Sequence, residues 1–405
     1  MNKLRLCLSR WRLWLAVRLY GRSNLPARQR GWILRQLVKR GNPAGWSPVV
    51  LQQADLIPWR DLLNGPAGGE AYCGGILFGK DEMTPQLRHW RGQQAIDTPL
   101  WAETDAAQDS LVVPNRLFWC GPLTFHFGHQ VADFGSRVLL ASLDIRGGVL
   151  LWYPWRAANS FQSLLPWQRF LLDYLNPGKK PYWIPTEPIR AKEIVVYPQQ
   201  APMRSLPSPA HLEALGWCER QIDPKKSEVL YVSRARFAAC RSADNLLGAY
   251  AGEELLEAML DARGVRVIHP ETLTLREQLE FYRGAKALIV AEGSAQHGIE
   301  LLGFHGDTPL VVICRRQQRE GMELPLQARF PHVQFVEALK EQWQAADGVA
   351  WDGLALLDWF VVAEALNPLL DVPLSPAECM DLQRKGEHQL QQLSAILSMC
   401  PVKRV

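Results

Sequence analysis

The chain has 405 residues, of which 47% are hydrophobic and 21% are charged. This composition is that of a globular protein, and it excludes disorder, collagen and coiled coil as descriptions of the whole chain. The formal net charge of +4 hides an asymmetry, because residues 1–40 hold eleven Lys or Arg and no Asp or Glu. Subtracting those eleven charges leaves −7 on the remaining residues.

The pattern of apolar and basic residues over 1–41 predicts a basic amphipathic N-terminal arm. Its apolar positions recur at helical spacing, at Leu4, Leu8, Trp11, Leu15 and Leu19. Such a helix either lies peripherally in an anionic membrane interface or packs on its own domain. The chain lacks a basic stripe elsewhere, so we expect no nucleic-acid partner. It also lacks an apolar run of the ~18 residues that span a bilayer, so we expect a cytoplasmic protein, which the arm would attach to the inner face of the membrane if it binds lipid and does not pack on its own domain.

Residues 42–205 predict a first α/β domain. Residues 42–125 are rich in Pro, Gly and Trp, which indicates short strands and long loops. The elements expected next are a helix over Phe127–Leu143, a strand over Gly147–Tyr153, a helix over Phe161–Leu175 and a strand over Lys192–Tyr197. The Pro-rich segment Gln199–Pro209 is interpreted as a linker.

Residues 206–345 predict a second domain in which short apolar strands alternate with helices of about ten residues. The expected strands are Glu228–Ser233, Val265–His269, Lys286–Ala291 and Thr308–Cys314, and the expected helices are Gly252–Arg263, Leu275–Gly284 and Ser294–Leu302. Thr274 and Glu277 form a capping-box pattern at the start of the second helix. This alternation is typical of a parallel sheet covered on both faces, with ligands bound beyond the carboxyl ends of its strands. Residues 346–405 predict a helical segment that ends in a helix over Pro376–Ser398.

Arginines follow the first of these strands. Arg234 and Arg236 stand just beyond it, beside Ser233, and Arg241 comes shortly after. Guanidinium groups bind phosphate oxygens two at a time, so the three arginines suit a diphosphate. The alternative is that they form ion pairs with neighbouring acidic residues.

A turn of small residues follows the third strand. Gly293 lets a ligand approach the backbone, Ser294 offers a hydroxyl, and exposed N–H groups at the following helix favour an anion. Glu292 lies before this turn, and His297 lies one helical turn after it.

His129 and Asp133 are four residues apart in the first predicted helix and therefore share a face. A carboxylate orients an imidazole and raises its basicity, which suits a general base. A solvated His–Asp pair has the same spacing, so both interpretations stay open.

Several familiar motifs are missing or incomplete. The stretch GGILFGK at Gly74–Lys80 begins like a P-loop, but Asp81 stands where Ser or Thr should bind magnesium. A G-x-G-x-x-G fingerprint and a D-x-D motif are absent, so we expect neither a dinucleotide cofactor nor a metal site.

The order of these blocks resembles glycosyltransferase family 61, above all its bacterial members associated with capsular and other surface polysaccharides. The blocks are FGHxxxD, a strand ending in SR, EELLEAML, and GVRVIHPETLTLREQLEFYRGAKALIV followed by a small-residue turn. The resemblance covers residues 228–305 and 125–140. It departs from the family at Glu292, because the usual turn reads H-G-A-G and begins with histidine.

The resemblance implies an α/β, GT-B-like fold, in which two Rossmann-like domains face a cleft, and an inverting transfer from a nucleotide sugar without a metal. Ser233, Arg234 and Arg241 match residues that would hold the donor diphosphate, and His129 and Asp133 match the H-x-x-x-D patch of the acceptor-side domain. The acceptor would be a glycan or a lipid-linked glycan. We expect the base to be His129, Glu292 or His297. The alternative function is a non-catalytic nucleotide- or partner-binding protein of polysaccharide assembly that keeps this fold.

Overall fold

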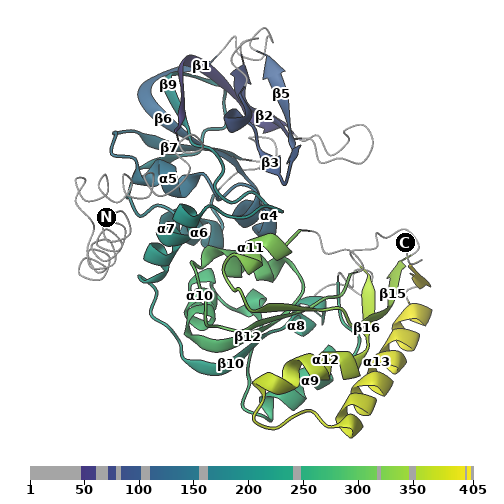
Figure 1. The fold of residues 1–405 in the computed structure, drawn as a ribbon. Helices are drawn as coiled ribbons and strands as arrows, with labels where there is room; N and C mark the ends of the chain where they lie inside the picture. The colour runs from purple at the N-terminus through teal and green to yellow at the C-terminus, as the bar shows by residue number, and fades with distance from the viewer. Residues whose placement is uncertain are drawn as a thin grey trace. The chain divides into compact units, whose positions relative to one another are not determined.

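A computed structural model of the chain describes residues 47–60, 72–78, 84–101, 110–154, 163–239, 248–316, 321–345, 353–396 and 399–402 (Figure 1). The predicted arm and Arg241 lie outside these residues. The chain divides into two compact units, Met1–Gln221 and Ile222–Val405, and each is described by itself.

Unit 1 is built on a seven-stranded mixed sheet with the order β5-β2-β1-β9-β6-β7-β8. Its strands are β1 (Val49–Arg60), β2 (Tyr72–Phe78), β5 (Asp97–Trp101), β6 (Leu111–Leu123), β7 (Val149–Pro154), β8 (Tyr182–Trp183) and β9 (Ile189–Val196). Strands β9, β6, β7 and β8 are parallel, whereas β1 runs antiparallel to both β2 and β9. The expectation of only short strands before residue 125 is wrong, because β1 has 12 residues and β6 has 13.

Short elements complete unit 1: η1 (Pro85–Leu87), the paired strands β3 (Trp90–Arg91) and β4 (Gln94–Ala95), α4 (Phe127–Ala132), α5 (Val138–Leu143), α6 (Pro166–Tyr174) and α7 (Pro209–Glu219). The helix predicted over Phe127–Leu143 is broken in two, because Gly135 and Ser136 are weak helix formers that fall between α4 and α5. The end of the predicted linker begins α7, where the Ser208 hydroxyl accepts the His211 N–H at 3.1 Å as an N-cap.

Unit 2 contains the predicted parallel sheet. The strands β10 (Ser227–Val232), β11 (Arg266–Ile268), β12 (Ala285–Ala291), β13 (Leu310–Ile313) and β14 (Val333–Val336) pair in the order β11-β10-β12-β13-β14, all parallel. The chain leaves β10 toward β11 on one side and returns to β12 on the other. The topological switch point, where ligands of open α/β sheets bind, therefore lies at the carboxyl ends of β10 and β12.

Helices cover both faces of this sheet, with α10 and α11 on one side and α9, α12 and α13 on the other (Figure 1). Their bounds are α8 (Ala235–Ala239), α9 (Glu253–Asp261), α10 (Leu275–Gly284), α11 (Glu323–Gln327), α12 (Trp359–Leu366) and α13 (Pro376–Ile396), with 3₁₀ helices η4 (Pro270–Thr272), η5 (Ser294–Leu301) and η7 (Asn367–Leu369). The capping box at Thr274 is confirmed. The segment predicted as a helix over Ser294–Leu302 is a 3₁₀ helix.

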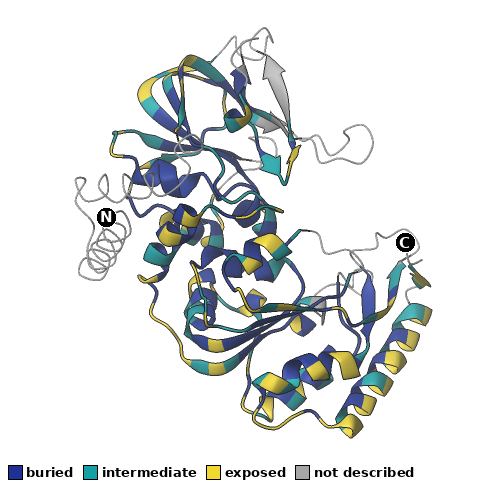
Figure 2. Ribbon diagram, in the orientation of Figure 1, coloured by how far each residue is buried: buried dark blue, intermediate teal, exposed yellow. Residues whose placement is uncertain are grey.

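A three-stranded antiparallel sheet of β15 (Leu339–Ala345), β16 (Leu354–Leu357) and β17 (Met399–Pro401) completes unit 2. On one face of the parallel sheet, Tyr231, Ile289 and Val311 form a core with apolar residues of α9, α12 and α13. Burial is nearly continuous along the central strands, while the outer side of α13 is exposed (Figure 2). Within the described residues, no helix is both long and apolar enough to cross a membrane.

A substitution at Gly178 tests how tightly unit 1 is packed around this residue. Its N–H donates to the Ser142 hydroxyl at 2.7 Å, and a Cβ at this position would lie 1.9 Å from the Ser142 carbonyl oxygen. We expect Gly178→Ala to lower the free energy of unfolding by about 2 kcal/mol or more, because backbone must move to admit the methyl group. Urea unfolding measures the change. Gly147→Ala is the matched control, since its Cβ would meet no atom within 4 Å. Equal unfolding midpoints for the two variants would contradict the packing described.

Candidate active site

Polar side chains follow four neighbouring strands of the unit 2 sheet. Ser233 and Arg234 come after β10, His269 after β11, Glu292 and Gly293 after β12, and Arg315 and Arg316 after β13. Because the strands are parallel, all of these residues lie at one edge of the sheet. The structure therefore brings together the two segments that sequence analysis selected, and it adds Arg315 and Arg316 to them.

Arg234 lies against the backbone of the small-residue turn. The residue is only 6% exposed, and its Nε donates to the Gly248 carbonyl at 3.1 Å. A Cβ on Gly293 would lie 1.7 Å from Nη1 of Arg234. Gly293 has extended backbone that any residue adopts, so the glycine is required here for space alone. Arg236, by contrast, is exposed.

The Glu292 carboxylate is engaged by the arginines that follow β13. Its Oε2 accepts the backbone N–H of Arg315 at 2.7 Å, and its Oε1 lies 3.0 Å from Nε of the Arg316 guanidinium. The Arg315 Nε also donates to the Glu292 carbonyl at 3.2 Å. Glu292 is thus placed as the counter-ion of an arginine cluster.

Positive charge is crowded at this edge. Burial and, to a smaller extent, the charges of Arg316 and Arg234 together lower the pKa of Arg315 to about 10. Arg315 is only 4% exposed, and a Cβ on Gly248 would lie 2.4 Å from its guanidinium carbon. Three guanidinium groups therefore stand near one carboxylate, and an anionic ligand would reduce their mutual repulsion.

Ser233 is buried beneath this edge and contacts α9. Its hydroxyl donates toward Glu253 Oε1, 3.1 Å away, and also contacts Glu257. Its Oγ accepts the N–H of Ala235 at 3.0 Å. The side chain therefore holds the turn after β10 in place.

Ser294 and His297 lie in or beside η5. Ser294 is partly exposed next to Gly293. His297 is 4% exposed, and its Nδ1 lies 2.6 Å from Oε1 of Glu300, which is also buried. An imidazole enclosed in this way has little access to a substrate.

In unit 1, His129 and Asp133 form a charged cluster with Arg91. The His129 Nδ1 lies 2.7 Å from Asp133 Oδ2, and Arg91 donates to the same carboxylate at 2.7 and 3.2 Å. Asp133 is fully buried, while His129 is partly exposed. Arg91 comes from β3, distant in the sequence, and sequence analysis did not select it.

Two contacts bear on the tautomer of His129, because its Nδ1 lies 2.7 Å from Asp133 Oδ2 and 3.0 Å from Nη2 of Arg91. Burial opposes ionisation, but hydrogen bonds from His129 and Arg91 outweigh it and hold the pKa of Asp133 below its ordinary value. An ionised carboxylate cannot donate and favours a proton on Nδ1 of His129, whereas Arg91, which can only donate, competes for the lone pair of the same nitrogen. When Nδ1 carries the proton of a neutral imidazole, Nε2 is the nitrogen that accepts a proton.

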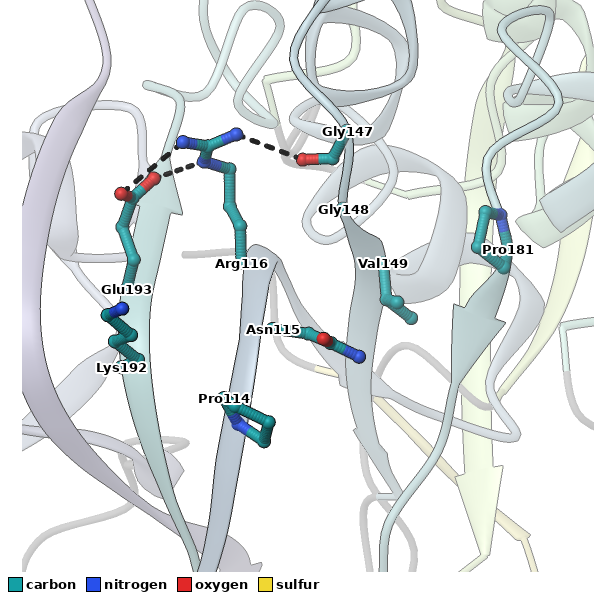
Figure 3. Close-up of a pocket in the computed structure, with 9 residues that line it drawn as sticks. All are labelled: Pro114, Asn115, Arg116, Gly147, Gly148, Val149, Pro181, Lys192 and Glu193. Carbon is teal, nitrogen blue, oxygen red and sulfur yellow. Dashed lines mark hydrogen bonds and ion pairs between the residues drawn. The ribbon is translucent and has the colours of Figure 1, made fainter.

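An open cavity of ≈ 510 Å³ lies elsewhere in unit 1 (Figure 3). It is lined by Pro114, Asn115, Arg116, Gly147, Gly148, Val149, Pro181, Lys192 and Glu193. These residues include the first half of β6 and the start of β7, whereas His129 follows the end of β6. Arg116 pairs with Glu193 and donates to the Gly147 carbonyl at 3.1 Å. The cavity is therefore at the opposite edge from the His129 cluster, and we do not assign the chemistry to it.

Metal-binding side chains do not gather in the described parts of either unit: no group of three or more His, Cys, Asp or Glu is placed to hold an ion there.

The Asp133 cluster predicts a pH-dependent stability. A lowered pKa means that the ionised form stabilises the fold above the ordinary Asp pKa of ~3.9, and that this contribution is lost as pH falls through the lowered value. We expect Asp133→Asn to cost on the order of 2 kcal/mol at neutral pH. The cost should shrink below about pH 4.

Urea unfolding of both proteins between neutral and acidic pH measures this difference. Asp173→Asn is the control, since Asp173 is exposed on α6 of the same unit. A cost for Asp133→Asn that does not change with pH would show that the carboxylate charge contributes nothing.

Residues 127–301 match the sequence model of the family described as Glycosyltransferase 61. The match begins at α4 and ends at η5, so it includes His129 and Asp133 but not Arg91, and it includes the turns after β10 and β12. No curated protein matches the chain. A solved structure with similarity is the iron-containing dodecameric glycosyltransferase TibC from enterotoxigenic E. coli H10407, with 13% identity over 87% of this chain and 95% of that one. Its TM-score of 0.28 is too low to support an argument about this chain. Residues 127–301 therefore carry the sequence pattern of glycosyltransferase family 61, and this match supports a glycosyltransferase activity for the protein.

Proposed function

We propose that the protein is an inverting, metal-independent glycosyltransferase that takes its sugar from a nucleotide-sugar donor. The arginine cluster at the carboxyl edge of the unit 2 sheet is the observation that carries this proposal. It lies beside a topological switch point, and guanidinium groups bind diphosphate oxygens. Arg234, Arg315 and Arg316 would hold the diphosphate, with Arg236 at the exposed side and Ser294 beside the turn. Arg241 stays a predicted member of this set.

The arginines would stabilise the leaving group. In an inverting transfer the acceptor oxygen bonds to the anomeric carbon while the bond from that carbon to the diphosphate oxygen breaks, and the electron pair leaves with the diphosphate. Guanidinium groups placed in advance around that developing charge lower the barrier. They supply the charge stabilisation that a metal ion provides in other enzymes.

His129 is the base that the geometry favours. It is partly exposed and oriented by an ionised Asp133, so its Nε2 would take the proton of the acceptor hydroxyl. Glu292 is engaged by Arg315 and Arg316, and His297 is buried beside Glu300. Both of these predicted alternatives therefore fit a supporting role better than that of the base.

A role in capsular or other surface polysaccharide synthesis, with a glycan or lipid-linked glycan as acceptor, is our proposal from the family resemblance. The GT-B-like arrangement, with an acceptor domain over residues 42–205 and a donor domain over 206–345, likewise stays a prediction. So do a cytoplasmic location and contact of the N-terminal arm with the inner face of the membrane.

Variants of the two clusters test the mechanism. We expect His129→Ala to slow transfer by about 10²- to 10⁴-fold, because it removes the base. We expect Arg234→Ala to slow it by about 10²- to 10³-fold and to weaken donor binding, because it removes a partner of the diphosphate. Turnover of UDP-, dTDP-, GDP- and ADP-sugars, measured with and without a chelator, provides the readout.

The exposed residues His388 and Arg384 on α13 provide matched controls, and His388→Ala and Arg384→Ala should keep full activity. Loss of all turnover in chelator would refute metal independence. Normal turnover by both His129→Ala and Arg234→Ala would refute the site.

The arm is tested by charge neutralisation in the full chain. A smaller fraction of the triple variant Arg5→Gln, Arg12→Gln and Arg18→Gln should sediment with anionic vesicles. Each basic residue near such a surface contributes about 1 kcal/mol to the free energy of membrane binding. Co-sedimentation with vesicles containing phosphatidylserine measures the loss. Donor turnover in solution is the control and should not change. Unchanged vesicle recovery would mean that the arm packs on the protein.

A further inference from the structure

Glu253 lies beneath the turn that carries Arg234. It is the first residue of α9 and is 2% exposed. The N-cap residue before it, Gly252, has a positive φ of 91°. Oε1 of Glu253 accepts from the Tyr231 hydroxyl at 2.8 Å and from the backbone N–H of Arg234 at 2.8 Å, and it lies 3.1 Å from the Ser233 hydroxyl, whose closer partner is Glu257. One carboxylate oxygen therefore ties the end of β10 to α9.

The second oxygen is placed very differently. Oε2 of Glu253 is buried and has no hydrogen-bond partner among the described residues. A buried ionised carboxylate normally needs partners for both oxygens, because water no longer solvates it. A proton on Oε2 would remove the charge and leave the hydrogen bonds from Tyr231 and Arg234 to Oε1 intact.

We propose that Glu253 is a positioning residue for the anion site: its carboxyl fixes the Ser233–Arg234 turn, and the gain or loss of its proton sets how tightly the anionic donor is held. This inference rests on the proposed function, because the anion is the donor diphosphate. An ionised Glu253 adds negative charge beside Arg234 and opposes the ligand, whereas the protonated form does not.

The groups around Glu253 favour gain and loss of its carboxyl proton near neutral pH. Burial raises the pKa of Glu253 to about 7, against the hydrogen bonds from Arg234 and Tyr231 and the charge of Arg234, which lower it. The other titratable groups that act on it are Glu257 of α9 and Tyr250 of the preceding segment. On the side of α13, the uncharged Gln389 accepts the Gly252 N–H at 2.8 Å.

The sign of the effect follows from linkage. An anion favours the protonated carboxyl, so donor binding takes up a proton and affinity falls as pH rises through about 7. A coupling of one pK unit would correspond to about a tenfold change in Kd. Glutamine keeps an oxygen acceptor and carries no charge, so Glu253→Gln should hold the high affinity of low pH across the whole range.

The test is the Kd of the tightest-binding sugar from the nucleotide-sugar panel, measured by calorimetry from below to above pH 7. The diphosphate diester of such a donor keeps its charge over that range. We expect about a tenfold weakening for the wild type, a flat profile for Glu253→Gln, and a wild-type profile for Glu254→Gln, which removes an exposed charge from the same helix. A flat wild-type profile, or an unchanged slope in Glu253→Gln, overturns the inference.

A second measurement needs no variant. Calorimetry near pH 7 in buffers of different ionisation enthalpy reports proton uptake by the wild-type protein, and uptake of a fraction of a proton per donor is expected. Absence of uptake overturns the inference even if Glu253→Gln does not fold. Donor binding that depends on Arg234 at a single pH tests the proposed function separately. If the wild type binds no donor, the proposed function and this inference fall together.

Discussion

The crowding of buried guanidinium groups around one carboxylate is the constraint on which the site depends. Arg234 and Arg315 are each no more than 6% exposed, yet Glu292 is the carboxylate placed against the group. Burying like charges together costs free energy, and here backbone carbonyls of Gly248 and Glu292 offset part of that cost. The parallel sheet explains why these residues lie close together, because the carboxyl ends of β10, β12 and β13 are all at one edge of the sheet.

Glycine makes this crowding sterically possible. Gly293 and Gly248 each lie where a Cβ would meet a guanidinium group, Arg234 in the first case and Arg315 in the second. Gly248 has a positive φ of 67°, whereas Gly293 is extended, so only the close approach explains the residue at 293. The small-residue turn that suggested a phosphate cradle in the sequence is thus filled by an arginine from the neighbouring strand end, which brings the charge directly onto the turn.

The sequence predicted the first four strands of the unit 2 parallel sheet because their signals are local, but it missed β14, and the prediction of a purely helical segment over 346–405 is wrong, because β16 and β17 lie there. Strands that are buried on both faces appear in the sequence as short apolar runs, and a capping-box pattern indicates the start of α10. The same strand-end argument that selected Arg234 applies to Arg315 and Arg316, which follow the predicted strand Thr308–Cys314. No sequence pattern marks Arg91, because β3 has only two residues and is too short to show a strand periodicity. The segment is held by a contact distant in the sequence, in which the Gly92 N–H donates to the carbonyl of Met203. β6 contains Pro114 and Gly121, residue types that disfavour strands, yet long-range pairing with β7 and β9 continues the strand through both.

Two buried carboxyl groups illustrate how surroundings divide the chemistry between the units. Asp133 receives hydrogen bonds from Arg91 and His129 on both oxygens, and these outweigh burial, so its pKa falls and it stays ionised to orient the imidazole. Glu253 receives all of its hydrogen bonds on one oxygen, and burial prevails, so its pKa rises to about 7. A base requires a fixed charge behind it, whereas a site for a dianion benefits from a nearby carboxyl that can become neutral. Opposite shifts in two similar groups therefore fit the two roles that a metal-independent transfer would require.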